Sequence, residues 1–292
     1  CNGEPILIPT QDIVLGAYYL CQSFPTHEHS TLPLINSFEE VFVAWSNKIL
    51  NLHDWIRLKN PDYGKFTKYG NSEERTVDTT IGRVLFNSIW PPSVGFFNRT
   101  AKKEDLSDLI LETYLSSNRS ETVKAIDKLK EMCFEMVTKS GISISLFDLR
   151  IPAEKHELIT ETHTQNNLVE EQFREGIITR GERHRKIVMN WSNTSLKLAQ
   201  RVLNSLKSET KNNESNPVYM IIDSGSRGTA QQVNQICGMK GVSPKTSNEF
   251  LEKPILNNFR EGLTALDYFR TTRGSRKGLA ETALRTADAG FL

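Results

Sequence analysis

The sequence has few cysteines and no long hydrophobic run. Its 292 residues include four scattered cysteines, Cys1, Cys21, Cys133 and Cys237, with no Cys-x-x-Cys pair. This scatter argues against a zinc site or a disulfide framework and predicts reduced thiols in a cytosol. Because no apolar run approaches the length that crosses a bilayer, we expect no membrane association.

Net charge is nearly absent as well. Lys and Arg number 36 against 35 Asp and Glu, so the formal charge of +1 gives no global case for nucleic-acid binding. Nucleic-acid binding would therefore have to depend on a local cluster of basic residues. The sequence holds no Gly-x-x-x-x-Gly-Lys-Ser/Thr phosphate loop. His27-Glu28-His29 lies in a proline-flanked loop without a convincing third ligand, so we expect no metal site.

The first 145 residues predict a mixed α+β unit. Apolar spacing indicates a short helix from Asp12, a helix over 37–44, and two amphipathic helices over 102–115 and from Ser120 onward. Residues 75–81 read as a strand ending at Gly82. Residues 22–75 are otherwise irregular in composition.

Residues 151–210 predict a long αα-hairpin. Pro152 opens a mostly polar helix, the stretch from Arg174 to Gly181 supplies the break, and a second helix carries Ile187, Trp191, Leu198, Val202 and Leu206 on one face. On this pattern alone, a solvated pair of charged helices is the favoured interpretation.

The last third holds the most informative pattern. Arg227 sits between Gly225 and Gly228, where the backbone can bend sharply and expose a guanidinium. By itself such a turn is more often an ordinary surface turn. A helical pattern then follows, in which Arg270, Arg273 and Lys277 fall at i, i+3 and i+7 and so share a face that could meet nucleic-acid phosphates. The helix also contains Gly274 and Gly278, which favour a bend or a close backbone approach.

Several blocks together resemble the beta-prime subunit of bacterial multisubunit DNA-dependent RNA polymerase. Ser224-Gly225-Ser226-Arg227-Gly228 resembles the family's Ser-Gly-Ala-Arg-Gly, and Gln235-Ile-Cys-Gly-Met-Lys-Gly241 resembles its Gln-Leu-Ala-Gly-Met-Arg-Gly. Further blocks agree in order: Asn2 to Gly16, Thr79 to Arg83, Lys139 to Ile144, Asn258 to Leu263 and Gly274 to Ala280.

The resemblance implies a predominantly helical α+β fold. It consists of a mixed α/β pore domain over 1–145, a funnel domain with the helical hairpin over 146–215, and over 216–292 a nucleotide-proximal loop and the first part of the bridge helix. The chain starts at Cys1 inside a family block and stops at Leu292 inside a helical pattern. We therefore expect an internal fragment that is inactive alone. Its catalytic magnesium, the cofactor of the whole enzyme, would be held by ligands outside these residues.

The resemblance also assigns site residues. Arg227, Met220, Ile221 and Gln11 would lie near the incoming nucleoside triphosphate, with Arg227 on its phosphates and Tyr219 beside the path. The template and RNA would lie near Arg270, Arg273, Arg276, Lys277, Arg285, Thr286, Ala287 and Phe291. Small Thr286 and Ala287 would leave room for the templating base, and Phe291 replaces the family's usual tyrosine. The hairpin tip, with Arg174, Arg180 and Arg183, would dock secondary-channel transcription factors.

The implied enzyme is a cytoplasmic nucleotidyltransferase of the bacterial nucleoid that transcribes DNA into RNA. Its partners would be the DNA template, RNA, nucleoside triphosphates and the alpha, beta, omega and sigma subunits. A different class of function stays open on the residues alone: a free-standing adaptor whose charged hairpin binds proteins and whose basic helix only solubilises.

Overall fold

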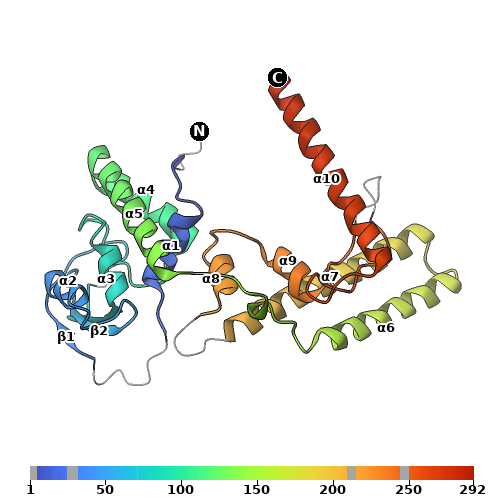
Figure 1. Ribbon diagram of the computed structural model, residues 1–292, viewed down its shortest axis with the longest axis horizontal. Coiled ribbons are helices and arrows are strands. Elements are labelled where there is room, and N and C mark those ends of the chain that lie inside the picture. The colour runs from blue at the N-terminus through green and yellow to red at the C-terminus, as the bar shows by residue number, and fades with distance from the viewer. Residues whose placement is uncertain (1–4, 25–31, 71, 209–214, 244–249) are drawn as a thin grey trace. The chain divides into compact units, whose positions relative to one another are not determined.

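The computed structural model describes residues 5–24, 32–70, 72–208, 215–243 and 250–292 (Figure 1). They form two compact units: residues 1–143 with 211–228, and residues 144–210 with 229–292. The predicted fold class, predominantly helical α+β, is confirmed. By packing, residues 211–228 go with the first unit, whereas the functional division into pore, funnel and bridge-helix domains stays a prediction. No helix in the described ranges is long and apolar enough to cross a membrane.

The first unit contains a small mixed sheet. β1 (Leu34–Ile35) pairs in parallel with β2 (Trp55–Lys59), which pairs antiparallel with β3 (Thr76–Thr80). Ile56 and Leu58 alternate along β2 and are fully buried. The sequence predicted β3 but missed β1 and β2, because a strand of two residues and one of five residues are too short to show a period.

The first unit also contains several helices, most of which share one buried core with Ile35, Ile56 and Leu58 of this sheet. They are α1 (Asp12–Cys21), α2 (Phe38–Ser46), α3 (Ile81–Asn87), α4 (Lys103–Ser116), α5 (Arg119–Ser140) and α8 (Pro217–Asp223). α1 lies against α5, where a Cβ at Gly16 would come within 2.8 Å of the Cα of Cys133. Glycine at position 16 is therefore required by the close approach of two helix backbones.

The boundary between β3 and α3 corrects the predicted strand over 75–81. Thr80 ends the strand and caps the helix, since its Oγ1 accepts a hydrogen bond of 3.4 Å from the backbone N–H of Arg83. Ile81 and Gly82 are thus helical. The buried guanidinium of Arg83 donates to the carbonyl of Cys21 at 3.0 Å and to the Oγ of Ser23 at 2.8 Å, which fixes α3 to the end of α1.

The second unit is organised around the helical hairpin. α6 (Lys155–Arg174) and α7 (Arg180–Ser208) lie side by side, joined by the short connection over 175–179 (Figure 1). A 3-10 turn (Leu146–Asp148), α9 (Ala230–Val233), a π-type turn (Asn234–Gly238) and α10 (Ala265–Phe291) complete the unit. Its buried apolar cluster is formed by Val169, Ile187, Trp191, Leu198 and Met239.

Candidate functional site

The turn after α8 presents Arg227 to solvent. Gly225 and Gly228 have φ angles of 74° and 79°, so both glycines adopt the left-handed conformation for which glycine is favoured. Between them the side chain of Arg227 is exposed. Within the part of the chain that the structure describes, its guanidinium makes no ion pair, so its donors are available to a ligand.

Local hydrogen bonds make this turn a defined structure. The hydroxyls of Ser224 and Ser226 both donate to the carbonyl of Ile221, each at 3.0 Å. The backbone N–H of Lys103, in the first turn of α4, donates to the carbonyl of Ser224 at 3.1 Å. The backbone that leads to Arg227 is therefore fixed by hydrogen bonds, while the side chain of Arg227 is exposed.

The other predicted nucleotide-proximal residues differ in exposure. Met220 is only 5% exposed and lines a cavity of about 700 Å³ in the first unit, whereas Ile221 and Tyr219 are half-buried. Gln11 is exposed at the start of α1 and has a positive φ of 54°, a costly conformation for a residue with a side chain. α1 and α8 pack against one another, so Gln11 and Met220 come from neighbouring elements.

Sequence reasoning missed an acidic residue beside the turn. Asp223, the last residue of α8, accepts a hydrogen bond of 2.9 Å from the hydroxyl of Tyr18 and pairs at 2.7 Å with the ammonium of Lys102. Burial, and then the negative charge of Asp223, raise the pKa of the Tyr18 hydroxyl. The available signal was an aspartate directly before a glycine-rich turn.

The predicted nucleic-acid residues all lie on α10, a helix of 27 residues of which none is buried among the described residues. Arg273, Arg276, Arg285, Thr286, Ala287 and Phe291 are exposed, while Arg270 and Lys277 are half-buried. Arg270 lies 3.9 Å from Asp267, and Lys277 lies 3.7 Å from Glu281, each within the helix. The helix thus offers a long surface with cations along it.

Two of the blocks that carry the resemblance, residues 235–241 and 258–263, are in contact just before α10. The fully buried side chain of Asn258 donates to the carbonyls of Cys237 and Gly238 at 3.0 and 3.2 Å, and its oxygen accepts from the backbone N–H of Glu261 at 2.7 Å. Glu261 in turn pairs with the buried ammonium of Lys155 at the start of α6. The segment directly before α10 is therefore held to the π-type turn and to the start of α6 by polar contacts of buried side chains.

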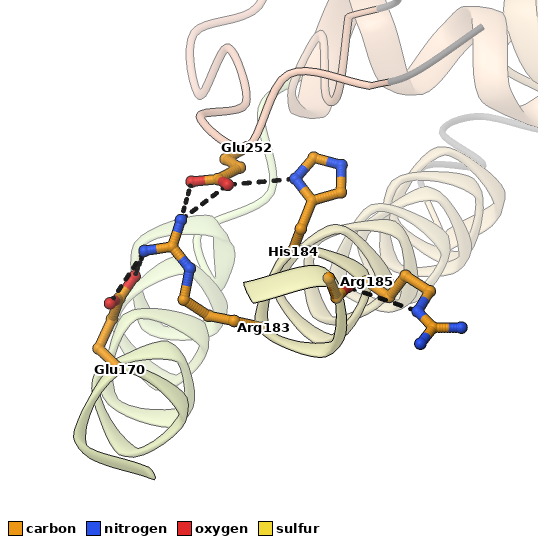
Figure 2. A network of polar contacts seen from close by, with 6 residues as sticks. Glu170, Arg183, His184, Arg185 and Glu252 are labelled. Atoms are coloured by element: carbon orange, nitrogen blue, oxygen red, sulfur yellow. Dashed lines mark hydrogen bonds and ion pairs between the residues drawn. The ribbon is translucent and has the colours of Figure 1, made fainter. Parts of the chain in front are cut away.

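Arg183, predicted as a docking residue, is occupied by contacts inside the second unit (Figure 2). One end of its guanidinium donates to both oxygens of Glu252, each at 2.8 Å, and the other end reaches Glu170 at 3.0 and 3.2 Å. The group also lies over the ring of Phe173, 5.2 Å from its centre, and its side chain is 18% exposed. These contacts hold the guanidinium of Arg183 within the second unit, whereas the side chains of Arg174 and Arg180 are exposed.

The described residues show no metal-binding group. None of their His, Cys, Asp and Glu side chains form a cluster of three or more that could hold an ion. His27-Glu28-His29 and Cys1 lie outside the described residues. Cys21, Cys133 and Cys237 are buried free thiols, and burial raises the pKa of Cys133 to about 12 and that of Cys237 to about 11.

Comparison of the sequence with models of known protein families shows the family to which the chain belongs. The family described as RNA polymerase Rpb1, domain 3, matches residues 1–149, and RNA polymerase Rpb1, domain 4, matches residues 178–262. The chain belongs to the RNA polymerase Rpb1 domain 3 family. The two matches cover the sheet-containing part of the first unit, α7 and the residues leading to α10.

Proteins from several bacteria are similar to this chain along its whole length. The DNA-directed RNA polymerase subunit beta' of Methylacidiphilum infernorum is 46% identical over 294 residues, and that of Opitutus terrae is 47% identical over 294 residues. The corresponding subunit of Pelotomaculum thermopropionicum is 38% identical over 295 residues. All of this chain is covered, but only 21%, 21% and 23% of the three relatives, so the chain spans about a fifth of their length.

Proposed function

We propose that this chain is part of the beta-prime subunit of a bacterial DNA-directed RNA polymerase, where it borders the channel through which nucleoside triphosphates reach the active site. Family membership and similarity along the whole chain to bacterial beta-prime subunits support this assignment. The whole enzyme would transfer nucleotides to RNA on a DNA template in the bacterial cytoplasm, with alpha, beta, omega and sigma subunits. Its magnesium would be held by residues outside this chain.

The exposed guanidinium of Arg227 on its fixed turn is the observation that carries the proposal. A planar fork of donors matches the oxygens of a triphosphate better than a lysine ammonium does. Because the turn is already ordered, little backbone freedom is lost when the side chain meets a phosphate. We assign Arg227 to the phosphates of the incoming nucleotide, and Gln11, Tyr219 and Ile221 to the channel wall.

Met220 takes a different role in this assignment. Its side chain is 5% exposed, so we assign it to the support of α8 and of the cavity that it lines, and not to the exposed surface of the channel wall.

α10 is proposed as the first part of the bridge helix. The cations Arg270, Arg273, Arg276 and Lys277 would meet phosphates of nucleic acid, a contact that does not depend on base sequence. Further along, Arg285, Thr286 and Ala287 would lie beside the templating base, and Phe291 would offer a stacking face without a hydroxyl. The exposure of this helix over its whole length supports a role in contact with something outside the chain.

The tip of the hairpin is proposed as a docking site for transcription factors that enter the channel, with Arg174 and Arg180 as the contacting charges. Both are exposed and flank the connection between α6 and α7. A free-standing adaptor would use the same tip. Factor binding therefore does not separate the two functions, whereas nucleotide kinetics do.

The test replaces Arg227 by alanine in the full-length subunit, assembled into polymerase. A charge-assisted contact is worth roughly 1.5 to 3 kcal/mol, so the apparent KM for nucleoside triphosphates should rise by about ten-fold or more. Arg75→Ala is the matched control, because Arg75 is also an exposed arginine of the first unit. If Arg227→Ala and Arg75→Ala elongate equally well at limiting nucleotide, the assignment of Arg227 is wrong.

A further inference from the structure

Asp223 lies at the junction between α8 and the turn that carries Arg227. It is the last residue of the helix and lies four positions before Arg227, whose guanidinium is proposed to contact the nucleotide. Its own side chain is three-quarters buried, with 25% of it exposed. A carboxylate in this place has to be explained, because a negative charge near a triphosphate site is unfavourable unless it is neutralised.

Two side chains orient this carboxylate, and one of them, Lys102, also neutralises its charge. Its Oδ2 accepts from the hydroxyl of Tyr18 on α1 at 2.9 Å, and its Oδ1 lies 2.7 Å from the ammonium of Lys102, directly before α4. Burial, and then the negative charge of Asp223, raise the pKa of the Tyr219 hydroxyl on α8. Asp223 therefore connects α1, α8 and the start of α4 at one point.

The neighbouring backbone is tied to the same place. The carbonyl of Ser224 accepts from the N–H of Lys103, so consecutive residues 223 and 224 are held by consecutive residues 102 and 103. A Cβ at Gly225 would lie 3.3 Å from the Cβ of Lys103, which leaves little room for the turn to shift towards α4. The base of the turn is fixed at several points, while Arg227 at its far side is exposed.

We propose that Asp223 is a positioning residue for Arg227: through Tyr18 and Lys102 it holds the turn in the conformation from which the guanidinium reaches the nucleotide phosphates. This inference rests on the proposed function of Arg227. Asp223 does not contact the nucleotide itself, because both of its oxygens are engaged within the first unit. Misplacement of a binding group by about 1 Å is enough to weaken its contact severely.

The experiment is a double-mutant cycle in the full-length subunit assembled into polymerase, with Asp223→Ala, Arg227→Ala and the double variant. Apparent KM for nucleoside triphosphate and kcat are measured separately, and assembly yield is measured for each variant. Asp223→Ala should raise the KM by roughly 3- to 10-fold, less than Arg227→Ala does, with a smaller change in kcat. In the Arg227→Ala background it should add nothing. Asp223→Asn, which keeps one acceptor oxygen, should recover part of the loss.

The outcomes separate this inference from the function on which it rests. An unchanged KM in Arg227→Ala overturns the proposed function. A raised KM in Arg227→Ala together with an unchanged KM in Asp223→Ala overturns the positioning role alone. Independent, multiplicative effects of the two substitutions also overturn it, because Asp223 would then act by another route.

A milder variant keeps the test decisive if Asp223→Ala does not assemble. Tyr18→Phe removes only the hydroxyl that donates to Asp223 from a side chain that is 5% exposed. The positioning role predicts a raised KM in Tyr18→Phe that disappears in the Arg227→Ala background. If Tyr18→Phe assembles and leaves the KM unchanged, Asp223 is a stability residue only.

Discussion

Arg183 and Glu252 are joined by two hydrogen bonds of 2.8 Å, both donated by one nitrogen of the guanidinium to the two carboxylate oxygens (Figure 2). The residues are 69 positions apart in the chain, so this pair ties the first turn of α7 to the segment that leads towards α10. Glu170 on α6 occupies the other end of the same guanidinium. One arginine thus connects three segments of the second unit.

Loss of this pair should destabilise the chain measurably. Arg183→Met should lower the free energy of unfolding by about 1 kcal/mol, because charged hydrogen bonds are lost but the carboxylates are more than a third exposed. Arg180→Met, at an exposed residue of the same turn, should change it by less than about 0.5 kcal/mol. Urea unfolding of both variants checks this, and equal effects of the two substitutions would show that the pair contributes nothing.

The pH dependence of stability should show a step from His53. Burial lowers the pKa of this imidazole, whose Nδ1 lies 3.3 Å from the carbonyl of Gln22. Since the folded pKa lies below the unfolded value, the stabilisation is complete above about pH 6.5 and is lost as the pH falls through that range. The free energy of unfolding should therefore fall from pH 7 to pH 5, and His53→Gln should remove that step. An unchanged slope in the variant contradicts the assignment.

The free energy of unfolding should show a second step at lower pH, caused by Glu252. Burial alone would raise the pKa of this carboxyl, but hydrogen bonds from His184 and Arg183 and the charge of Arg183 outweigh it and lower the pKa. A depressed carboxyl pKa stabilises the fold above about pH 4.3, and this stabilisation is lost as the pH falls below that value. Glu252→Gln should flatten only this lower step.

Charge reversal at the hairpin tip should separate factor docking from stability. Arg174→Glu and Arg180→Glu should weaken the binding of channel-entering factors to the assembled polymerase and leave factor-free elongation nearly normal. Arg183→Glu should instead lower stability, because it places a third carboxylate between Glu170 and Glu252. A large elongation defect in Arg174→Glu or Arg180→Glu would argue against a role at the channel rim.

Gly278 tests whether α10 bends during the reaction cycle. Among the described residues, a Cβ at this position would meet no atom within 4 Å outside the helix's own backbone, so alanine does not clash within this chain. Alanine favours the helix by about 1 kcal/mol at such a position. Gly278→Ala polymerase should assemble normally but show altered elongation rate and pausing, with similar nucleotide affinity. Normal assembly with unaltered pausing would contradict the hinge, and failed assembly would indicate close packing against another subunit.

The long elements could be predicted because their patterns are long. Apolar spacing was enough for the hairpin, since Ile187, Trp191 and Leu198 do line its buried face, and the paired glycines around Arg227 do adopt left-handed conformations. The resemblance also singled out Arg227, and the structure shows that the side chain of Arg227 is exposed.

Other features could not be predicted because they depend on contacts between distant residues. The short strand β2 is defined by its partners in β1 and β3 and not by its own five residues. The ion pair of Arg183 needs Glu252, and the hydrogen bond of Asp223 needs Tyr18, 205 positions away. A sequence shows that these residues are charged but not which of them meet.

The most direct test of the central claim asks whether position 227 touches the nucleotide phosphates. Arg227→Lys polymerase, which keeps a cation with a reactive amine, is incubated with a nucleoside triphosphate that bears an aldehyde on its γ-phosphate. Borohydride then reduces the imine, and mass spectrometry locates the label. The account predicts labelling of the substituted lysine at position 227 that unmodified nucleoside triphosphate competes away. Labelling confined to other lysines in an active enzyme would contradict it.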